Sequence, residues 1–360
     1  MSKRTNWQPL LICLLIPFLF AFGKPEKETA KEKAPEGVWT IQLMPTGVNK
    51  VHDVVFWSQG TYFATNKGIY KADLLLNTPR NNWPKVQGSQ ATFTDLQVQI
   101  VAGVKTEILA YAGTSGQSGI FYTGSIKKNS PNQISARERT TGRIQGLGMV
   151  GSLAHANCTF VLNGATDVMC MSTSRNCRSL TAFQNGRRVN GTMTNVFGYM
   201  KNKGLIIGGS GPFVYVLDLS GQICDNSWKV KSYRFVPNSV PPTGSVVQFV
   251  SDETSYEVFA ATSRGYIYRS TNGGKTWKYY AHGLKPQDDP TQLYSMVTHR
   301  DKLYISTNRG LFFTSKTGVQ ADWKPYSGLP GWRNKRVNLY TSAIHLIAEI
   351  DGITYKRQLN

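Results

Sequence analysis

A short unit of two β-strands around a glycine-centred turn recurs along this chain. Each copy has an apolar strand, a small residue with Thr-x-x-Gly, and a second strand that continues with aliphatic and aromatic residues. The turn needs a backbone with positive φ, which glycine adopts at little cost. The clearest copies are residues 62–70, 108–122, 258–268 and 303–313, and the weaker ones are residues 160–171, 205–217 and 346–355.

The turn centres of these copies recur at intervals of about 47 residues. They fall near Gly68, Gly119, Asp167, Phe213, Gly265, Gly310 and Gly352. No long stretch has helical periodicity, and each interval leaves room for two further strands. A repeat of four strands is typical of a β-propeller. The sequence therefore predicts an all-β fold over residues 37–360: a seven-bladed β-propeller with four-stranded antiparallel blades.

The N-terminal end of this region is expected to close the ring. Several outer strands begin at a tryptophan, namely Trp83, Trp228, Trp277 and Trp323. The last unit leaves no room for an outer strand of its own, whereas residues 38–44, with Trp39, have outer-strand character. We expect residues 38–44 to complete the last blade, so that neither end leaves an unpaired sheet edge.

One hairpin turn, residues 268–277, carries a more specific pattern, Ser-x-Asn-x-Gly-x-Thr-Trp. Its residues are Ser270, Asn272, Gly274, Thr276 and Trp277. The pattern resembles the Asp-box, or BNR repeat, of sialidases, sortilin-type receptors and photosystem assembly factors, and the chain resembles the non-catalytic members more than true sialidases. The polar groups can bond the backbone of the turn, which indicates a structural role. The resemblance implies a place between the third and outer strands, on the face opposite known catalytic centres. Residues 314–323 look like a degraded second copy.

The first 36 residues are predicted to lie outside the propeller. Lys3 and Arg4 precede an apolar run of about 15 residues, shorter than the ~20 that span a bilayer. Residues 1–23 therefore have the layout of a signal peptide, and residues 24–36, rich in Lys and Glu, that of a charged flexible linker. We expect a secreted, extracellular monomer, held at a membrane only if the signal peptide stays uncleaved as an anchor.

The charge indicates what kind of partner to expect. The formal net charge is +20, and residues 121–240 hold 14 Lys and Arg against 4 Asp and Glu. Such a charge favours acidic partners, here an anionic glycan or an acidic protein surface. Nucleic acid is not expected as a partner because the chain has no visible nucleic-acid-binding module.

Blade topology predicts where these cations gather. In an up-and-down blade, the turn between the second and third strands shares a face with the connections between blades. Clustered arginines suit carboxylate, sulfate or phosphate groups, and Trp332 could stack on a sugar or base. The predicted binding residues are Lys67, Arg139, Arg143, Arg187, Arg188, Arg264, Arg309, Trp332, Arg333, Lys335 and Arg336.

The function predicted from these patterns is that of a non-enzymatic binding or scaffold protein. The alternatives are a sialidase-like glycan-processing hydrolase or lyase, and a secreted virulence or assembly factor with one protein partner. Tyr233, Arg234 and Pro237 resemble a sialidase tetrapeptide with one inserted residue, but in mid-chain. Two carboxylates in a central pocket would favour an enzyme, whereas Arg, Asn and aromatic residues there would favour binding. We predict no catalytic residues.

Histidines and cysteines indicate neither a metal nor a cofactor. The 5 histidines have no metal-ligand spacing, so no metal site is predicted. Cys158, Cys177 and Cys224 are expected on one face, with one disulfide, either Cys158–Cys177 or Cys177–Cys224. Asn157 and Asn190 lie in glycosylation sequons, which fit a eukaryotic secretory route.

Overall fold

The computed structural model describes the protein from residue 37 to residue 359, apart from residues 58–59, 74, 94, 102–104, 113–119, 127–132, 140–143, 151–157, 164–166, 173–175, 182, 185–186, 189–192, 201–203, 210–212, 219–229, 235–245, 252–256, 283–291 and 319. Between residues 94 and 245 it describes strands as backbone, with the side chains of Val214 and Val216. By its internal contacts the chain divides into residues 1–36 and 37–360. The predicted signal peptide and linker lie outside the described residues and stay predictions.

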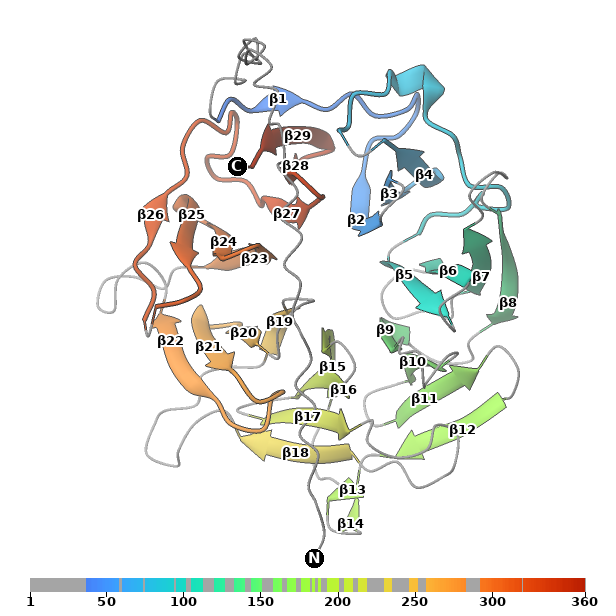
Figure 1. Ribbon diagram of the computed structural model, residues 1–360, viewed down its shortest axis with the longest axis vertical. Coiled ribbons are helices and arrows are strands. Elements are labelled where there is room, and N and C mark those ends of the chain that lie inside the picture. The colour runs from blue at the N-terminus through green and yellow to red at the C-terminus, as the bar shows by residue number, and fades with distance from the viewer. Residues whose placement is uncertain are drawn as a thin grey trace, which may run out of the picture. The chain divides into compact units, whose positions relative to one another are not determined.

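The strands form a succession of antiparallel sheets in which chain neighbours pair with one another (Figure 1). Four blades are described with their side chains. In spatial order they contain β2 (Val51–Trp57), β3 (Gly60–Thr65) and β4 (Gly68–Ala72); β19 (Val246–Ser251), β20 (Val258–Thr262), β21 (Tyr266–Ser270) and β22 (Lys278–His282); β23 (Leu293–His299), β24 (Lys302–Thr307), β25 (Gly310–Ser315) and β26 (Lys324–Pro325); and β27 (Asn338–Thr341), β28 (His345–Ile350), β29 (Ile353–Gln358) and β1 (Thr40–Ile41).

Further antiparallel sheets are described as backbone between residues 95 and 234. In spatial order they contain β5 (Asp95–Val101), β6 (Lys105–Ala112), β7 (Ile120–Ile126) and β8 (Gln133–Arg139); β9 (Ile144–Val150), β10 (Cys158–Asn163), β11 (Asp167–Ser172) and β12 (Asn176–Thr181); and β15 (Met193–Met200), β16 (Gly204–Gly209), β17 (Phe213–Asp218) and β18 (Val230–Arg234). A separate two-stranded sheet pairs β13 (Phe183–Gln184) with β14 (Arg187–Arg188).

The first strands of successive sheets lie side by side around one axis (Figure 1). The adjacent pairs are β2–β5, β5–β9, β9–β15, β15–β19, β19–β23, β23–β27 and β27–β2. The protein is therefore an all-β propeller with antiparallel four-stranded blades, as predicted.

Each predicted copy of the repeat corresponds to two adjacent antiparallel strands of a blade. The hairpins are β3–β4, β6–β7, β10–β11, β16–β17, β20–β21, β24–β25 and β28–β29. At their tips Gly68, Gly265 and Gly310 have φ of 124°, 77° and 124°, the positive values for which glycine was expected.

Apolar side chains fill the interfaces between neighbouring blades. Trp277, Phe249 and Val258 of one blade pack with Val214 and Val216 of the blade before it. Because a propeller sheet is covered on both faces, its second strand can be buried along its whole length. Accordingly β3, β20 and β28 are buried at every position.

The N-terminal strand completes the last blade. Thr40 pairs with Lys356 and Ile41 with Tyr355, and the Gln42 N–H donates to the Thr354 carbonyl at 2.8 Å. The expected pairing of this segment with the last strand is confirmed at Thr40–Ile41. The described ends of the chain thus meet in one sheet.

The first blade has a reduced outer strand. After the short 3-10 helix η1 (Arg80–Asn82), Lys85 forms an isolated bridge with Tyr70, and the Lys71 N–H donates to the Pro84 carbonyl at 3.0 Å. Pro84 has no N–H to donate, which an outer strand tolerates. The tryptophan that begins this segment, Trp83, is buried.

The strand order bears on the predicted disulfides. Cys158 begins a second strand, β10, as expected, but Cys177 lies within β12 rather than in the turn before it. Strand β11 lies between β10 and β12. Adjacent strands are about 4.8 Å apart, so these Cα atoms are separated by about 10 Å, beyond the ~7 Å reach of a disulfide. This separation is unfavourable for the Cys158–Cys177 pairing, which also stays a prediction. Cys224 lies outside the described residues, so Cys177–Cys224 stays a prediction.

Candidate functional site

The turns between second and third strands hold exposed cations on rigid tips. The Thr65 hydroxyl accepts from the Lys67 N–H at 3.0 Å and donates to the Gly68 carbonyl at 2.8 Å. Thr307 makes the same two bonds, accepting from the Arg309 N–H at 3.0 Å and donating to the Gly310 carbonyl at 3.1 Å. The Thr and Gly fix the backbone, while the cationic side chain between them is exposed.

An asparagine in the same turns ties the tip to the chain that leads into the first strand. Asn66 Oδ1 accepts from the N–H groups of Asn49 and Lys50, both at 3.2 Å. Asn308 Oδ1 accepts from the Gln292 N–H at 3.0 Å. The turns are thereby joined to the connections between blades. We call the surface formed by turns 65–68, 262–265, 307–310 and 350–353 and by connection 332–336 the loop face.

Connection 332–336 adds an aromatic ring and further cations to the loop face. The Trp332 ring lies over Gly310, where an added Cβ would come within 3.4 Å of it. Arg333, Lys335 and Arg336 are exposed. Lys335 Nζ lies 2.9 Å from Asp351 Oδ2, in the β28–β29 turn. The Trp332 ring thus lies beside the turn that carries Arg309.

The remaining predicted binding residues are only partly placed. Arg264 is exposed in the β20–β21 turn, equivalent to Lys67 and Arg309. Arg139 ends the outer strand β8. Arg187 and Arg188 form β14, next to β13, which contacts the outer strand β18. Arg143 lies outside the described residues.

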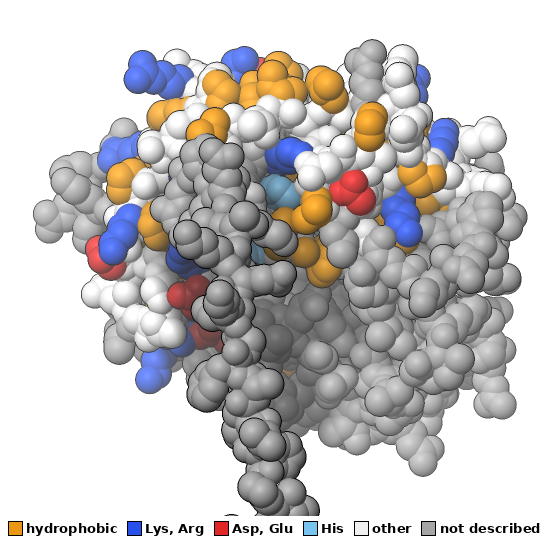
Figure 2. Space-filling view, turned by 45° about the horizontal axis from the view of Figure 1, so that its top comes forward, with side chains coloured by type: hydrophobic (Ala, Val, Ile, Leu, Met, Phe, Trp, Pro, Cys, Tyr) orange, Lys and Arg blue, Asp and Glu red, His pale blue; other side chains and the backbone are white. Residues whose placement is uncertain are grey.

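The cations do not form one continuous patch on the surface seen in Figure 2. Lys and Arg side chains are spread over the described part of that surface, with hydrophobic side chains between them (Figure 2). An extended ligand would suit this distribution better than a single small anion.

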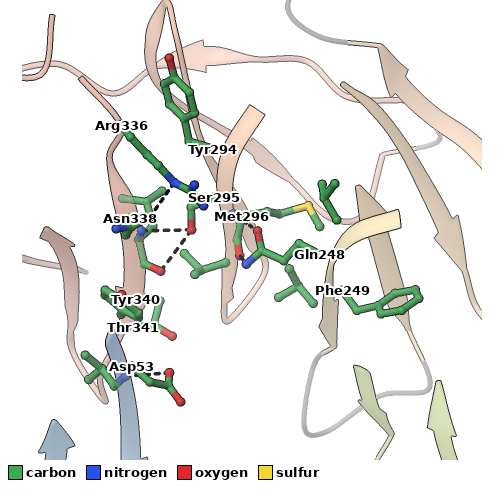
Figure 3. A pocket seen from close by; sticks show the side chains of 15 residues that line it. Asp53, Gln248, Phe249, Tyr294, Ser295, Met296, Arg336, Asn338, Tyr340 and Thr341 are labelled. Carbon is green, nitrogen blue, oxygen red and sulfur yellow. Dashed lines mark hydrogen bonds between the residues drawn. The ribbon is translucent and has the colours of Figure 1, made fainter. Parts of the chain in front are cut away.

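An axial pocket of about 430 Å³ lies among the first strands β2, β19, β23 and β27 (Figure 3). Arg336 belongs both to its lining and to the loop face. The other lining residues are Asp53, Val54, Val247, Gln248, Phe249, Val250, Tyr294, Ser295, Met296, Val297, Asn338, Leu339, Tyr340 and Thr341. The sequence analysis singled out Arg336 but missed the rest.

One polar residue occupies the same register position in each blade whose side chains are described. Asp53, Gln248, Ser295 and Asn338 each pair with the penultimate residue of the second strand in their blade. All four line the axial pocket. Once the hairpins are aligned, this position can be found in the sequence.

Two of these residues fasten neighbouring blades together. Gln248 Nε2 donates to the Met296 carbonyl, and its Oε1 accepts from the Met296 N–H, both at 2.7 Å. Ser295 Oγ accepts from the Leu339 N–H at 3.1 Å and donates to the Leu339 carbonyl at 3.3 Å. In each case the side chain satisfies both backbone groups of a residue in the next blade.

The pattern changes between β27 and β2, a junction we call the seam. Asn338 donates to Glu349 Oε2 at 2.7 Å and accepts from Arg336 Nε at 3.3 Å, so its carboxamide is engaged within its own blade. Asp53 occupies the same position in the blade that follows, where its Oδ1 accepts from the Val54 N–H at 2.8 Å among its interactions. The seam thus differs from the junctions at Gln248 and Ser295.

Tyr340 links the two blades across the seam. Its hydroxyl donates to the carbonyls of His52 at 3.1 Å and Val51 at 3.4 Å. Burial, together with the Asp53 and Glu349 carboxylates, raises the pKa of Tyr340 above its ordinary value. The hydroxyl therefore stays protonated and able to donate across the physiological pH range.

The Ser270–Trp277 turn has a structural role in the described blade. Ser270 Oγ accepts from the Gly274 N–H at 2.8 Å, and Asn272 Oδ1 accepts from the Thr276 N–H at 2.9 Å. The Trp277 indole donates to the Gly274 carbonyl at 2.8 Å. The turn joins β21 to β22, at the opposite end of the blade from the β20–β21 turn. These bonds are of the kind predicted from the sequence.

The sialidase-like tetrapeptide does not lie at the axial pocket. Tyr233 and Arg234 end the outer strand β18, whose pairing partners are Val214 and Phe213. Pro237 lies outside the described residues. Among the described lining residues of the pocket, Asp53 is the single carboxylate.

The described part of the chain also shows neither a metal-binding group nor a helix that could span a membrane. It contains no group of three or more His, Cys, Asp or Glu side chains placed to hold a metal ion. None of its described helices is long and apolar enough to cross a membrane.

Comparisons with known proteins support the fold and do not indicate a function. No protein-family model matches the chain, and no curated protein matches it. Among solved structures, YCF48 from Cyanidioschyzon merolae is similar with a TM-score of 0.58 and 9% identity, over 89% of this chain and 99% of that chain. U3-55K has a TM-score of 0.58 and 13% identity, over 89% and 98%. The computationally designed Ika8 protein has a TM-score of 0.53 and 10% identity, over 86% and 84%. At these identities the likeness shows the propeller fold alone.

Proposed function

We propose that the protein is a secreted, non-enzymatic binding protein that holds an anionic partner, either a glycan or an acidic protein surface, on its loop face. The observation that carries this proposal is the repeated turn in which Thr and Gly fix the backbone and an exposed Lys67 or Arg309 projects from the tip. A cation on a fixed backbone loses less freedom on binding than one on a mobile loop.

The aromatic ring beside Arg309 supports a glycan as the partner. Trp332 lies over the adjacent Gly310. An aromatic face can pack on a sugar ring, while a guanidinium binds its carboxylate or sulfate through paired hydrogen bonds. The loop face offers both groups together.

The axial pocket offers polar groups suited to binding. A glycosidase of the usual kind needs two carboxyl groups within about 10 Å of each other. The described lining provides Asp53, together with Arg336, Asn338, Tyr294 and Tyr340. Such groups can orient a bound ligand through hydrogen bonds and charge.

The architecture that we propose for this function is a ring of seven blades. The cycle of adjacent first strands supports this number. The hydrogen bonds of Ser270, Asn272 and Trp277 support the assignment of that turn as an Asp-box. On this account the Asp-box lies away from the binding face.

Heparin chromatography with charge-reversal variants tests the proposed function. The test variant carries Arg264→Glu, Arg309→Glu and Arg333→Glu on the loop face. The matched control carries Lys275→Glu, Lys278→Glu and Lys324→Glu, which are exposed residues in or next to outer strands. Both triples change the net charge equally. We expect the loop-face variant to elute at clearly lower salt than the control. Equal elution of the two variants would contradict a binding site on the loop face.

A further inference from the structure

The strand β1 forms the outer edge of the last blade (Figure 1). Among the described strands it pairs with β29 on one side and with none on the other. The Gln42 N–H donates to the Thr354 carbonyl, towards β29. Because successive residues of an antiparallel strand point their backbone groups to opposite sides, the N–H groups of Ile41 and Leu43 point away from β29. We call residues 38–43, which present this open side, the edge segment.

The edge segment lacks the residues that protect the other described outer edges. Strand β26 consists of Lys324 and Pro325, and β22 begins at Lys278. The outer segment of the first blade contains Pro84 and Lys85. Lysine and proline on an edge strand discourage pairing with another chain. The edge segment contains no charged residue and no proline.

The edge segment instead exposes aliphatic side chains. Val38, Ile41 and Leu43 are 62%, 58% and 58% exposed. Ile353, at the start of the neighbouring strand β29, is 47% exposed. An exposed and uncharged strand edge is a template on which a further strand can be added. The edge segment thus offers backbone donors and apolar side chains to such a strand.

The charge of the protein favours one kind of added strand. The formal net charge is +20, so a second copy of the chain would bring a like charge, whereas an acidic segment would bring the opposite one. Cations also lie along the connection that leaves the edge segment. An added Cβ at Gly47 would lie 3.8 Å from Lys67 Cε, and Lys50 is exposed. Charge complementarity therefore favours an acidic partner.

We propose that the edge segment binds an extended acidic segment of a partner protein, which adds to the last blade as a further strand beside β1. The backbone of the partner accepts from the N–H groups of Ile41 and Leu43, and its carboxylates lie near Lys50 and Lys67. Its apolar side chains pack on the exposed aliphatic side chains. This inference rests on the proposed function in that it takes an acidic protein, rather than a glycan, as the partner. It adds backbone pairing that heparin cannot provide.

Fluorescence anisotropy of the intact protein with three labelled hexapeptides tests this proposal. The first peptide alternates glutamate and valine, and the second has lysine in place of glutamate. The third repeats the first with a methyl group on every backbone nitrogen, which blocks strand pairing and keeps the charge. We expect the first peptide to bind and each of the others to bind at least about tenfold more weakly.

A proline variant locates the binding site on the protein. Ile41→Pro removes an N–H that points away from β29, a change that an outer strand tolerates. We expect it to weaken binding of the acidic peptide at least about tenfold. Thr46→Pro is the matched control, expected to leave binding unchanged. Thr46 is the first central residue of the turn closed by the Val48 N–H and the Pro45 carbonyl at 3.0 Å, a position that suits proline.

Several results would overturn this proposal. They are absence of binding by the acidic peptide, and equal binding of the lysine peptide or the methylated peptide. Dimerisation that Ile41→Pro abolishes would identify a second copy as the occupant. Tighter peptide binding after deletion of residues 24–36 would identify the chain's own N-terminal segment.

Failure of this proposal is distinguishable from failure of the proposed function. The peptide comparison uses the unmodified protein, so its result does not depend on the stability of the variants. Heparin retention is measured without peptide, on variants of Arg264, Arg309 and Arg333, which lie outside the edge segment. Either result can therefore fail while the other holds.

Discussion

At the residue scale, the indole N–H groups of two tryptophans distinguish the Ser270–Trp277 turn from its degraded copy at residues 314–323. In the Ser270–Trp277 turn the indole N–H of Trp277 donates to Gly274. In the degraded copy the buried indole N–H of Trp323 has no hydrogen-bond partner among the described residues. The two turns therefore differ in whether the tryptophan indole is bonded within the turn.

Ser270→Ala is expected to lower the free energy of unfolding by about 1–3 kcal/mol. The change leaves the Gly274 N–H, in a buried residue, without its 2.8 Å acceptor. Thr271→Ala, at the exposed neighbouring residue, is expected to change it by less than about 0.5 kcal/mol. Urea unfolding monitored by tryptophan fluorescence measures both. A Ser270→Ala protein as stable as the Thr271→Ala protein would contradict the role given to Ser270.

His345 makes the stability of the last blade depend on pH. Its side chain is 6% exposed, and burial, with the Lys356 cation nearby, lowers the pKa of His345 from 6.5 to about 4. Between these values the unfolded chain binds the proton more readily than the folded chain. The contribution of neutral His345 to the free energy of unfolding is therefore fully present above pH 6.5, and it is lost as the pH is lowered towards 4.

The His345→Gln variant is expected to lose this part of the pH dependence. For the parent protein, the contribution of His345 between pH 6.5 and pH 4 is about 3 kcal/mol. Urea unfolding of parent and variant at both ends of this range measures the difference. If parent and variant lose the same stability on acidification, the buried neutral His345 is not responsible.

At the element scale, the short strand β1 joins the N-terminal segment to the last blade. Its register with β29, and Trp39 packed with Leu329 and Tyr355, connect residues that are far apart in the chain. Without β1 the edge of β29 would lack its partner strand. The closure therefore depends on a few residues.

Deletion of residues 37–45 is expected to abolish cooperative unfolding of the propeller. The change removes both the β1 pairing and the buried Trp39, whereas deletion of residues 24–36 removes only the predicted linker. Scanning calorimetry of the two truncated proteins measures the effect. A single sharp transition at the parent temperature after deletion of 37–45 would show that β1 does not hold the ring closed.

The sequence predicted hairpins better than outer strands, for physical reasons. Thr-x-x-Gly turns and fully buried, mostly apolar second strands leave a local pattern, as in β3 and β20. Outer strands are short and tolerate proline, as at Pro84 and Pro325, so their pattern is weak. The axial pocket escaped prediction because its polar residues are single positions that become related only when the blades are aligned in register.

At the scale of the whole molecule, the propeller separates the groups that hold it together from the groups that we propose bind a partner. Gln248, Ser295 and Tyr340 link neighbouring blades from inside the ring. The cations of the loop face stand on the turn tips, where a change of charge is expected to affect binding more than folding. This separation makes the proposed binding surface testable without disturbing the fold.

Hydrogen–deuterium exchange of the intact protein with and without a heparin oligosaccharide tests this account most directly. The measurement reports which backbone segments become protected when the ligand binds. We expect protection in the turns at residues 65–68, 262–265 and 307–310 and in the connection at residues 332–336, with no change at residues 271–277. Protection confined to residues 271–277, or no protection in any of these segments, would contradict a binding function for the loop face.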